Sequence, residues 1–294
     1  MDVGLIGLGA MARGMAASLR RAGLAVHVCD VRPEAVGSFV AEGGTGHADP
    51  ASLAKACDAV ICVVVNAAQT EAVLFGEKGA AAAMKRGSVF VMCSTVDPGW
   101  SVALEKRLEA LGILYLDAPI SGGAAKAAAG KITMMTAGKP EAYAKCQAAL
   151  DAMAGHVFRL GGRAGPGSTV KIVNQLLAGV HIAAAAEAMA LGIRAGVDPN
   201  ALYEVITASA GNSWMFENRM PHVLSGDYTP LSAVDIFVKD LGLVLDAARA
   251  TKFPLPLAST AHQMFMQASS AGHGREDDAA VIKIFPGIDL PAKK

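Results

Sequence analysis

The sequence has 294 residues, which is enough for two domains of roughly 150 residues each. Hydrophobic residues make up 53% of the chain and aromatic residues only 5%, a composition typical of buried parallel sheets covered by closely packed helices. The 26 basic residues balance the 26 acidic ones, whereas nucleic acid and anionic membranes favour an excess of basic charge. We therefore expect neither of them as a partner.

The cysteines and the apolar segments are typical of a cytoplasmic protein. The five cysteines form no CxxC pair and several stand in apolar runs, which favours buried, reduced thiols. The first apolar run begins at residue 3 and has no charged region before it, so we interpret it as a strand and not as a signal peptide. Leu176–Ile193 is apolar enough to imitate a membrane span, but it contains Glu187, and a carboxylate there costs about 2.5–3.5 kcal/mol. A buried helix and no membrane partner are expected.

Taken in chain order, short apolar runs alternate with helix-length segments through the first half of the chain. The predicted strands are Val3–Leu8, Ala25–Asp30, Ala59–Val65, Ser88–Cys93, Ile113–Ala118 and Ile132–Ala137. The predicted helices between them include Met11–Ala22, Pro33–Glu42 and Pro98–Leu111. This alternation indicates βαβ units and a mainly parallel sheet, and so predicts a Rossmann-type α/β domain over residues 1–164.

The second half of the chain is predicted to be helical throughout. The segment Gly161–Gly167 concentrates glycine and proline, as expected at a domain boundary. A long helix then runs from Ser168 to about Ala195, with Ser168 or Thr169 as its N-cap and Gly196 as its terminator. Shorter helices are predicted at 199–209, 215–222, 234–251 and 256–271. The fold class is therefore a Rossmann-type α/β domain plus an all-α domain over residues 165–294, linked by a long helix that we expect to be buried on every side.

A glycine-rich turn follows the first strand and points to a dinucleotide. Gly7-x-Gly9-x-x-Ala12 stands between a strand and a helix, where the first glycine permits a tight turn and the second lets backbone approach a pyrophosphate. Ala12 keeps strand and helix close in place of the usual third glycine. Residues Ala10 and Met11 open the helix whose N-terminus faces the phosphates, and we place them in the cofactor site. The alternative is a glycine turn with no ligand.

The second strand ends on Asp30, about 20 residues after the glycine turn, where a carboxylate accepts hydrogen bonds from the adenosine ribose. Its negative charge would repel a 2′-phosphate, which predicts NAD as the cofactor. Arg32, two residues later, is the opposing signal because a guanidinium accommodates that phosphate. The seven histidines show no metal-ligand spacing such as HxxxH, so we expect no metal.

Three further segments, in this order, resemble the β-hydroxyacid dehydrogenase family, which includes 3-hydroxyisobutyrate dehydrogenase and tartronate semialdehyde reductase. They read DAPISGG at 117–123, GPGSTVKIVNQ at 165–175 and VKD at 238–240. With the glycine turn, the resemblance covers nearly the whole chain. It implies NAD-dependent oxidation of a small-molecule hydroxyacid.

Lys171 is the predicted catalytic residue. A hydride that leaves carbon must be matched by a proton that leaves oxygen, and a desolvated lysine can accept that proton. In the family that this sequence resembles, the lysine at this position is the general acid/base. Asn174 and Gln175 share its helix face and are predicted to bind substrate, although many relatives carry Asn in place of Gln175. A lysine by itself is usually a surface charge, but this one stands among apolar neighbours beside the domain boundary, where we expect a cleft.

The other predicted site residues are shared between substrate and cofactor. Ser121, Gly122 and Gly123 follow a strand and would present a hydroxyl and backbone N–H groups to a substrate carboxylate. The resemblance implies that Thr95 contacts the nicotinamide half of the cofactor and that Lys239 reaches the cofactor from the helical domain. Asp240 would support Lys239 or Lys171. Without the other motifs, these features would be an ordinary turn and a solvated ion pair.

The resemblance is closest to the branch of the family that oxidises the four-carbon sugar acid L-threonate. Lys126 and the C-terminal segment GHGREDDAAVIKIF carry this likeness, and Lys126, Gln175 and His273 are polar groups that suit a polyhydroxylated substrate. The run around His273 is equally typical of a solvated loop. The alternatives are another oxidoreductase of the family and a non-catalytic dinucleotide-binding protein, but loss of dehydrogenase chemistry in the family is typically accompanied by loss of the lysine. The long apolar helix also predicts a homodimer or homotetramer.

Overall fold

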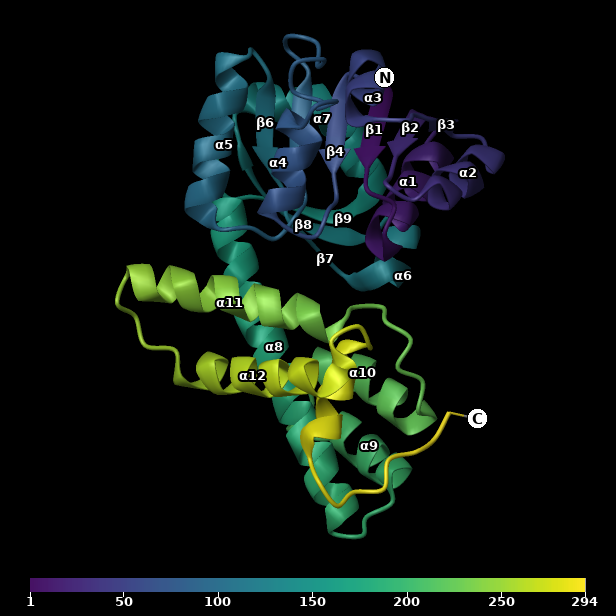
Figure 1. Cartoon of the computed structure of the whole chain (residues 1–294), viewed down its shortest axis with the longest axis vertical. Helices are drawn as coiled ribbons and strands as arrows, with labels where there is room; N and C mark the ends of the chain where they lie inside the picture. The colour runs from purple at the N-terminus through teal and green to yellow at the C-terminus, as the bar shows by residue number, and fades with distance from the viewer. Residues whose placement is uncertain (294) are drawn as a thin grey trace. The chain divides into compact units, whose positions relative to one another are not determined.

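The computed structural model describes residues 1–293, and its contacts divide the chain into Met1–Lys171 and a unit from Ile172 onward. The division lies inside the long helix, a few residues after the boundary predicted between 164 and 165. Figure 1 shows the sheet-containing unit in purple to teal and the helical unit in teal to yellow. Each unit is described by itself below.

The N-terminal unit is built on a nine-stranded sheet in the order β3-β2-β1-β4-β5-β6-β8-β7, with β9 paired to β8. All six predicted strands are present. The strands are β1 (Asp2–Ile6), β2 (Ala25–Cys29), β3 (Thr45–Gly46), β4 (Ala59–Cys62), β5 (Val89–Met92), β6 (Leu114–Asp117), β7 (Ile120–Ser121), β8 (Ile132–Gly138) and β9 (Ala154–Arg159). Strands β1 to β6 pair in parallel, which confirms the Rossmann-type domain.

Helices cover both faces of this sheet (Figure 1). They are α1 (Ala10–Arg21), α2 (Pro33–Ala41), α3 (Pro50–Ala56), α4 (Ala67–Phe75), α5 (Pro98–Ala110), α6 (Gly123–Ala128) and α7 (Pro140–Met153). One apolar core joins the sheet to α1, α2, α6 and α7, and a second joins it to α3, α4 and α5. Neighbouring residues of one strand alternate between the two cores, as Leu5 and Ile6 do in β1, because side chains alternate across a strand.

The far edge of the sheet departs from the parallel pattern. Strand β8 pairs antiparallel with both β6 and β7, so the predicted strand at 132–137 is present but reverses direction. Strands β3, β7 and β9 were not predicted. The first two are only two residues long, and β9 is largely exposed, so none of them carries the apolar run that marks a buried strand.

The five cysteines are all buried and unpaired, which confirms that part of the prediction. Burial raises the pKa of Cys29 to about 11 and of Cys57, Cys62 and Cys146 to about 12. These side chains are therefore neutral thiols that pack as small apolar groups.

The C-terminal unit is helical, as predicted. It comprises most of α8 (Pro166–Arg194), then α9 (Pro199–Thr207), α10 (Trp214–Ser225), α11 (Val234–Ala250), α12 (Pro256–Ala268), a π-helical turn (Ser269–His273) and a 3₁₀ segment (Asp278–Ile284). Ile182, Phe237 and Phe265 lie in the core that joins these elements. Gly196 ends α8 with a positive φ of 83°, and its N–H bonds to the carbonyl of Ile193.

The long helix differs from its prediction in two respects. It begins at Pro166, so neither Ser168 nor Thr169 is the N-cap. It is also not buried on every side, since Val173, Leu177 and Leu191 are each at least half exposed. Among the described residues α8 alone is long and apolar enough to cross a membrane, but Ile182, Ala186 and Met189 are fully buried in the helical core. Such burial is typical of the core helix of a globular domain.

The helical unit contains a buried ion pair between α10 and the 3₁₀ segment. Nε of Arg219 donates to Oδ1 of Asp278 at 2.5 Å and Nη2 donates to Oδ2 at 3.1 Å. Both side chains are buried. Burial raises the pKa of Asp278 to about 6 and outweighs the opposing attraction of Arg219.

This raised pKa predicts a pH-dependent stability. The folded state binds more protons than the unfolded state between about pH 4 and pH 6, so the contribution of Asp278 to the free energy of unfolding is lost as pH rises through that interval. The loss is of the order of 3 kcal/mol at 1.36 kcal/mol for each pKa unit. Urea denaturation of the wild type and Asp278→Asn at several pH values measures it. The stability difference between the two proteins should fall from pH 4 to 6 and stay level above; a constant difference would contradict the prediction.

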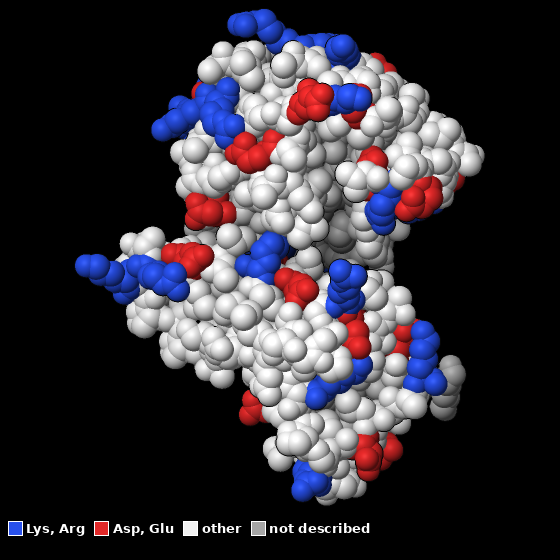
Figure 2. Space-filling model, in the orientation of Figure 1, with Lys and Arg blue, Asp and Glu red and all other residues white. Residues whose placement is uncertain are grey.

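Charged side chains of both signs are interspersed over the face drawn in Figure 2, and most of that face is uncharged. Charged side chains of the chain form ion pairs, as Arg107 does with Glu71 at 2.6 Å. Exposed pairs of this kind contribute little to stability.

Candidate active site

The carboxyl ends of the parallel strands bring the predicted residues of the N-terminal unit to one edge of the sheet. Gly7 follows β1, Asp30 follows β2, Thr95 follows β5 and Ser121 lies shortly after β6. The parallel ladder continues past the strand ends, because the N–H of Gly7 bonds to the carbonyl of Cys29 at 2.9 Å. Ligands of open α/β sheets bind at this edge.

The glycine turn has the geometry that a pyrophosphate requires. Gly7 has a φ of +91°, and a Cβ added to it would lie 2.4 Å from the carbonyl oxygen of Val63. Gly9 is exposed, and a Cβ there would meet nothing within 4 Å. Ala10, also exposed, begins α1, with Met11 half-buried behind it. The first glycine is thus required by the chain itself, while the second leaves open space in front of a helix N-terminus.

Asp30 is held against this turn. Its Oδ2 accepts from the N–H of Leu8 at 2.5 Å, and its Oδ1 accepts from the backbone N–H and Nε of Arg32 at 2.8 and 3.0 Å. Burial acts to raise the pKa of Asp30, but the hydrogen bonds from Arg32 and Leu8 outweigh it and the pKa is lowered. Arg32 also donates through Nη2 to the carbonyl of Leu8. Arg32, whose guanidinium was the signal in favour of NADP, therefore binds Asp30 and the backbone of the glycine turn.

Ser121 ends β7, Gly122 connects that strand to α6, and Gly123 begins the helix, so these three residues form the turn at 121–123. Gly122 and Gly123 have φ values of +133° and +74°, conformations that other residues rarely adopt. The stem of Lys126 lies across Gly122, because a Cβ added to that glycine would be 3.0 Å from the Cδ of the lysine. Gly122 therefore provides the room that the stem of Lys126 occupies.

Helix α1 packs closely on α6, which ties this turn to the cofactor edge. A Cβ on Gly14 would lie 2.5 Å from the backbone N of Ala128, and Ser18 donates to the carbonyl of Ala127 at 2.9 Å. Gly14 was not predicted as important. Its signal in the sequence, a glycine inside a helix two residues after the fingerprint, indicates a close approach of backbone.

Thr95 is half-buried two residues after Cys93. The hydroxyl of Ser94, beside it, is buried and has no hydrogen-bond partner within the described residues. An unsatisfied buried hydroxyl at the carboxyl edge fits a site that a polar ligand completes.

Lys171 lies in the second turn of α8 and is only 7% exposed. The first turn of the helix is bound by Asp117, the fully buried last residue of β6. Burial raises the pKa of this carboxyl group, although hydrogen bonds from Ser168 and Gly165 oppose the rise. Asp117 was not predicted as a site residue. Its sequence signal is its place as the first residue of the DAPISGG segment at 117–123.

In the helical unit, Asn174, Gln175 and Lys239 belong to one polar cluster around Asp240. Nε2 of Gln175 donates to Oδ2 of Asp240 at 2.6 Å, and Nδ2 of Asn174 donates to Oε1 of Gln175 at 3.0 Å. Lys239 forms an ion pair with the other oxygen of Asp240, which is 2% exposed. This contact is the first of the two alternatives expected for Asp240. His273, in contrast, pairs with Glu276 at 3.2 Å in the loop after α12.

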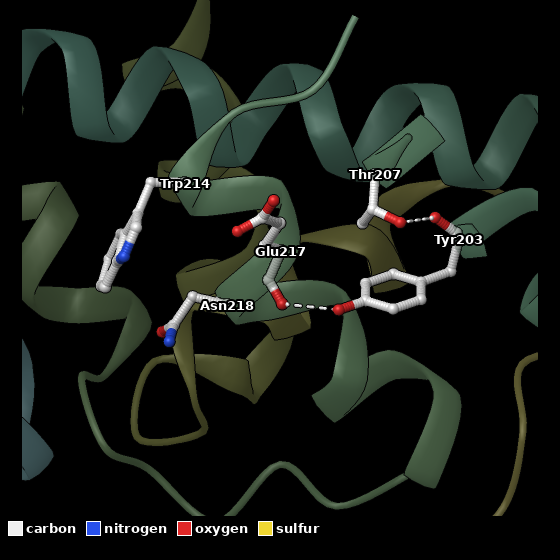
Figure 3. Close-up of a pocket in the computed structure, with 5 residues that line it drawn as sticks. All are labelled: Tyr203, Thr207, Trp214, Glu217 and Asn218. Atoms are coloured by element: carbon white, nitrogen blue, oxygen red, sulfur yellow. Dashed lines mark hydrogen bonds between the residues drawn. The ribbon is translucent and has the colours of Figure 1, made fainter. Parts of the chain in front are cut away.

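A cavity of about 380 Å³ lies between α9 and α10 (Figure 3). It is lined by Tyr203, Thr207, Trp214, Glu217 and Asn218. The hydroxyl of Tyr203 donates to the backbone carbonyl of Glu217 at 3.1 Å across it. None of the predicted site residues lines this cavity. Within residues 1–293 no group of three or more His, Cys, Asp or Glu side chains is arranged to hold a metal ion.

The fold, the glycine turn and Asp30 define a dinucleotide-binding dehydrogenase domain, and comparison with known proteins agrees. Residues 2–162 match the model for the NAD binding domain of 6-phosphogluconate dehydrogenase. Residues 165–285 match the NAD-binding model of NADP-dependent 3-hydroxyisobutyrate dehydrogenase. The chain belongs to the β-hydroxyacid dehydrogenase family related to 3-hydroxyisobutyrate dehydrogenase, and its cofactor is a nicotinamide dinucleotide.

Two relatives and one solved structure are similar over nearly the whole chain. The L-threonate dehydrogenase of Cupriavidus necator is 66% identical, with 99% of this chain and 98% of the relative covered. That of Escherichia coli is 53% identical, with 99% and 97% covered. A crystal structure named as 3-hydroxyisobutyrate dehydrogenase from Salmonella typhimurium is 54% identical with a TM-score of 0.94, and 97% of this chain and 100% of that chain are covered.

Proposed function

We propose that this protein oxidises L-threonate to the 2-oxo acid 2-dehydro-L-erythronate with NAD, using Lys171 as general acid/base. The observation that carries the proposal is the burial of Lys171 in the second turn of α8, since a lysine removed from water can exchange a proton near neutral pH. The identity of 53 to 66% to L-threonate dehydrogenases over the full chain supports the choice of substrate.

The chemistry requires a hydride and a proton to leave the same carbinol. A bound NAD would supply the hydride acceptor for C2. Lys171 in its neutral form accepts the hydroxyl proton at Nζ, so the C–O single bond becomes a carbonyl and the lysine becomes an ammonium. In the reverse direction the ammonium returns the proton to the carbonyl oxygen.

The turn at 121–123 is the proposed site of the substrate carboxylate. The Ser121 hydroxyl and the backbone N–H groups of Gly122 and Gly123 are donors, and the two positive φ values leave these groups in an open turn. Lys126 supplies a cation beside it. Asn174 and Gln175 are the proposed amide ligands of the substrate, and Asp240 fixes the orientation of Gln175.

NAD is the proposed cofactor, bound by Gly7, Gly9, Ala10, Met11, Asp30, Thr95 and Lys239. The discrimination against NADP rests on Asp30, which is held by Leu8 and keeps Arg32 in an ion pair. A 2′-phosphate would have to break that ion pair before it could bind Arg32.

Asp30→Ala should therefore change the cofactor preference. Removing the carboxylate abolishes a hydrogen-bond acceptor for the ribose and releases Arg32, whose guanidinium is half exposed. We expect the Kd for NADH to rise about 10- to 100-fold, the equivalent of one charged hydrogen bond of 1.5–3 kcal/mol. The NADPH affinity should improve relative to NADH. Fluorescence titration of both cofactors measures the two changes, with Asp97→Ala, a helix cap of α5, as control.

Two other substrates and one non-catalytic function compete with this proposal. The name of the Salmonella structure favours 3-hydroxyisobutyrate, and tartronate semialdehyde is a further small acid of the same class. A panel of L-threonate, 3-hydroxyisobutyrate and tartronate semialdehyde, each with NAD or NADH, separates them. Turnover of another acid without turnover of L-threonate would reject the substrate assignment. A protein that binds NADH but turns over no acid would favour the non-catalytic alternative.

We also propose that residues 1–164 bind the cofactor and that residues 165–294 serve the substrate and self-association in a cytoplasmic homodimer or homotetramer. The exposed apolar side chains of α8, such as Val173 and Leu177, support self-association because water contact is costly for them. Light scattering coupled to size-exclusion chromatography tests the oligomeric state, and a mass of 30.0 kDa would contradict it.

A further inference from the structure

Asp117 lies where two segments of the candidate site meet. It is the last residue of β6 and is fully buried. The chain that leaves it continues through β7 to the turn at 121–123. The side chain itself points to a different segment, the start of α8, which carries Lys171 five residues into the helix.

The carboxylate of Asp117 binds the first turn of α8 at three points. Oδ2 accepts from the backbone N–H of Gly165 at 2.9 Å and from that of Ser168 at 3.0 Å. Oδ1 accepts from the hydroxyl of Ser168 at 2.7 Å. The first N–H groups of a helix have no partner within the helix, and the helix N-terminus carries partial positive charge. A carboxylate from a strand therefore takes the place of a local N-cap.

Packing holds the same turn against the sheet. A Cβ on Gly167 would lie 2.6 Å from the carbonyl oxygen of Met135 and 2.9 Å from that of Asp117. The helix thus begins in direct contact with the backbone of β6 and β8. Lys171 follows Ser168 by three residues, which places it on nearly the same side of the helix, one turn further along.

We propose that Asp117 is a positioning residue for Lys171. Its carboxylate fixes the register and direction of the first turn of α8, and thereby fixes where the lysine amine meets the substrate hydroxyl. The inference rests on the proposed function, in which Lys171 is the acid/base. Misplacing a reacting group by about 1 Å can cost 10²-fold in rate.

The test begins with Asp117→Ala. Alanine has no acceptor for the backbone N–H groups of Gly165 and Ser168, whereas the amide oxygen of an asparagine could still accept from both. We expect kcat to fall about 10- to 100-fold with the Kd for NADH unchanged. Assays are made well below the melting temperature of the variant, because loss of the cap also lowers stability.

Glu105→Ala is the matched control. Glu105, in α5, is another buried carboxylate in the same unit, and it accepts from the backbone N–H of Ala164 at 3.2 Å. It holds the same linker just before the helix but does not touch its first turn. Its replacement should lower the melting temperature. The kcat should stay within about twofold of the wild-type value, which is a change in activation free energy well under 1.4 kcal/mol.

A second readout separates positioning from a general structural role. Lys171→Ala is assayed with added ethylamine, which supplies an acid/base that is not attached to α8. If Asp117 acts through Lys171, then Asp117→Ala should lower kcat in the protein with the lysine and should have no further effect in the amine-rescued variant.

An equal loss in both backgrounds, or unchanged kcat in Asp117→Ala, would overturn the inference. Those results leave the proposed function standing if Lys171→Ala is itself inactive without amine. Full activity of Lys171→Ala without amine would instead remove the acid/base assignment, and with it the role of Asp117.

Discussion

Replacing Lys171 with alanine lowers kcat for hydroxyacid oxidation by a factor of about 10²–10⁴, the usual contribution of a positioned acid/base. The side chain is 7% exposed, so water does not readily take over its proton transfer. The Kd for NADH stays unchanged because the glycine turn and Asp30 belong to other elements of the unit. Stopped-flow or steady-state measurement of NADH formation, combined with fluorescence titration of NADH, checks both expectations.

Lys145→Ala is the control for this substitution. Lys145 is an exposed lysine of α7 in the same unit, so its loss removes a charge without touching the site. Both variants should have the same melting temperature within experimental scatter if Lys171 acts in chemistry rather than in folding. Wild-type kcat in Lys171→Ala would show that the proton goes elsewhere, and the proposed mechanism would be wrong.

Gly7→Ala should lower the stability of the protein and Gly9→Ala should weaken cofactor binding, although the two glycines belong to one motif. At Gly7 the φ of +91° is strained for alanine and the new Cβ would overlap the Val63 carbonyl oxygen, so we expect the free energy of unfolding to fall by about 2–5 kcal/mol. At Gly9 the φ is −66° and a Cβ meets nothing within 4 Å, so the stability without cofactor should not change.

For NADH binding the order of the two variants is reversed, and Gly9→Ala is expected to have the larger effect. Where a pyrophosphate approaches Gly9, the added methyl group occupies its path, and the Kd for NADH should rise at least about tenfold, or 1.4 kcal/mol. Thermal unfolding with and without NADH separates the two variants. Unchanged NADH affinity in Gly9→Ala would mean that the pyrophosphate does not lie against this glycine.

Much of the fold followed from patterns that are local in the chain. Each buried parallel strand is a short apolar run, and each helix of the first half is bounded by glycine or proline, so all six expected strands formed. The strand at 132–137 was located correctly, but its direction was not specified by its own residues. Its antiparallel pairing with β6 depends on the turn through 121–130, because an apolar run reads the same in either direction.

The candidate site likewise contains residues that local motifs indicate and residues whose contacts depend on the tertiary structure. Gly7, Asp30 and Lys171 could be proposed as site residues because each stands in a motif in which neighbouring residues supply the context. The contacts of Asp117 and Gly14 could not be assigned from the sequence, because their partners Ser168 and Ala128 are far away in the chain. A glycine inside a helix indicates a close approach of backbone, but not which backbone approaches it. The ion pair between Arg32 and Asp30 likewise could not be predicted from the sequence, since an arginine two residues away can equally point to solvent.

The sequence by itself determined the class of cofactor and the reaction family, since both depend on residue types at fixed local spacing. Only the tertiary structure decided how α8 begins. A proline and two glycines at 165–167 permit a helix start but provide no side chain to cap it, so the cap comes from a buried carboxylate on β6. Helix N–H groups must be satisfied by whatever acceptor the fold brings to them, and that acceptor can stand anywhere in the chain.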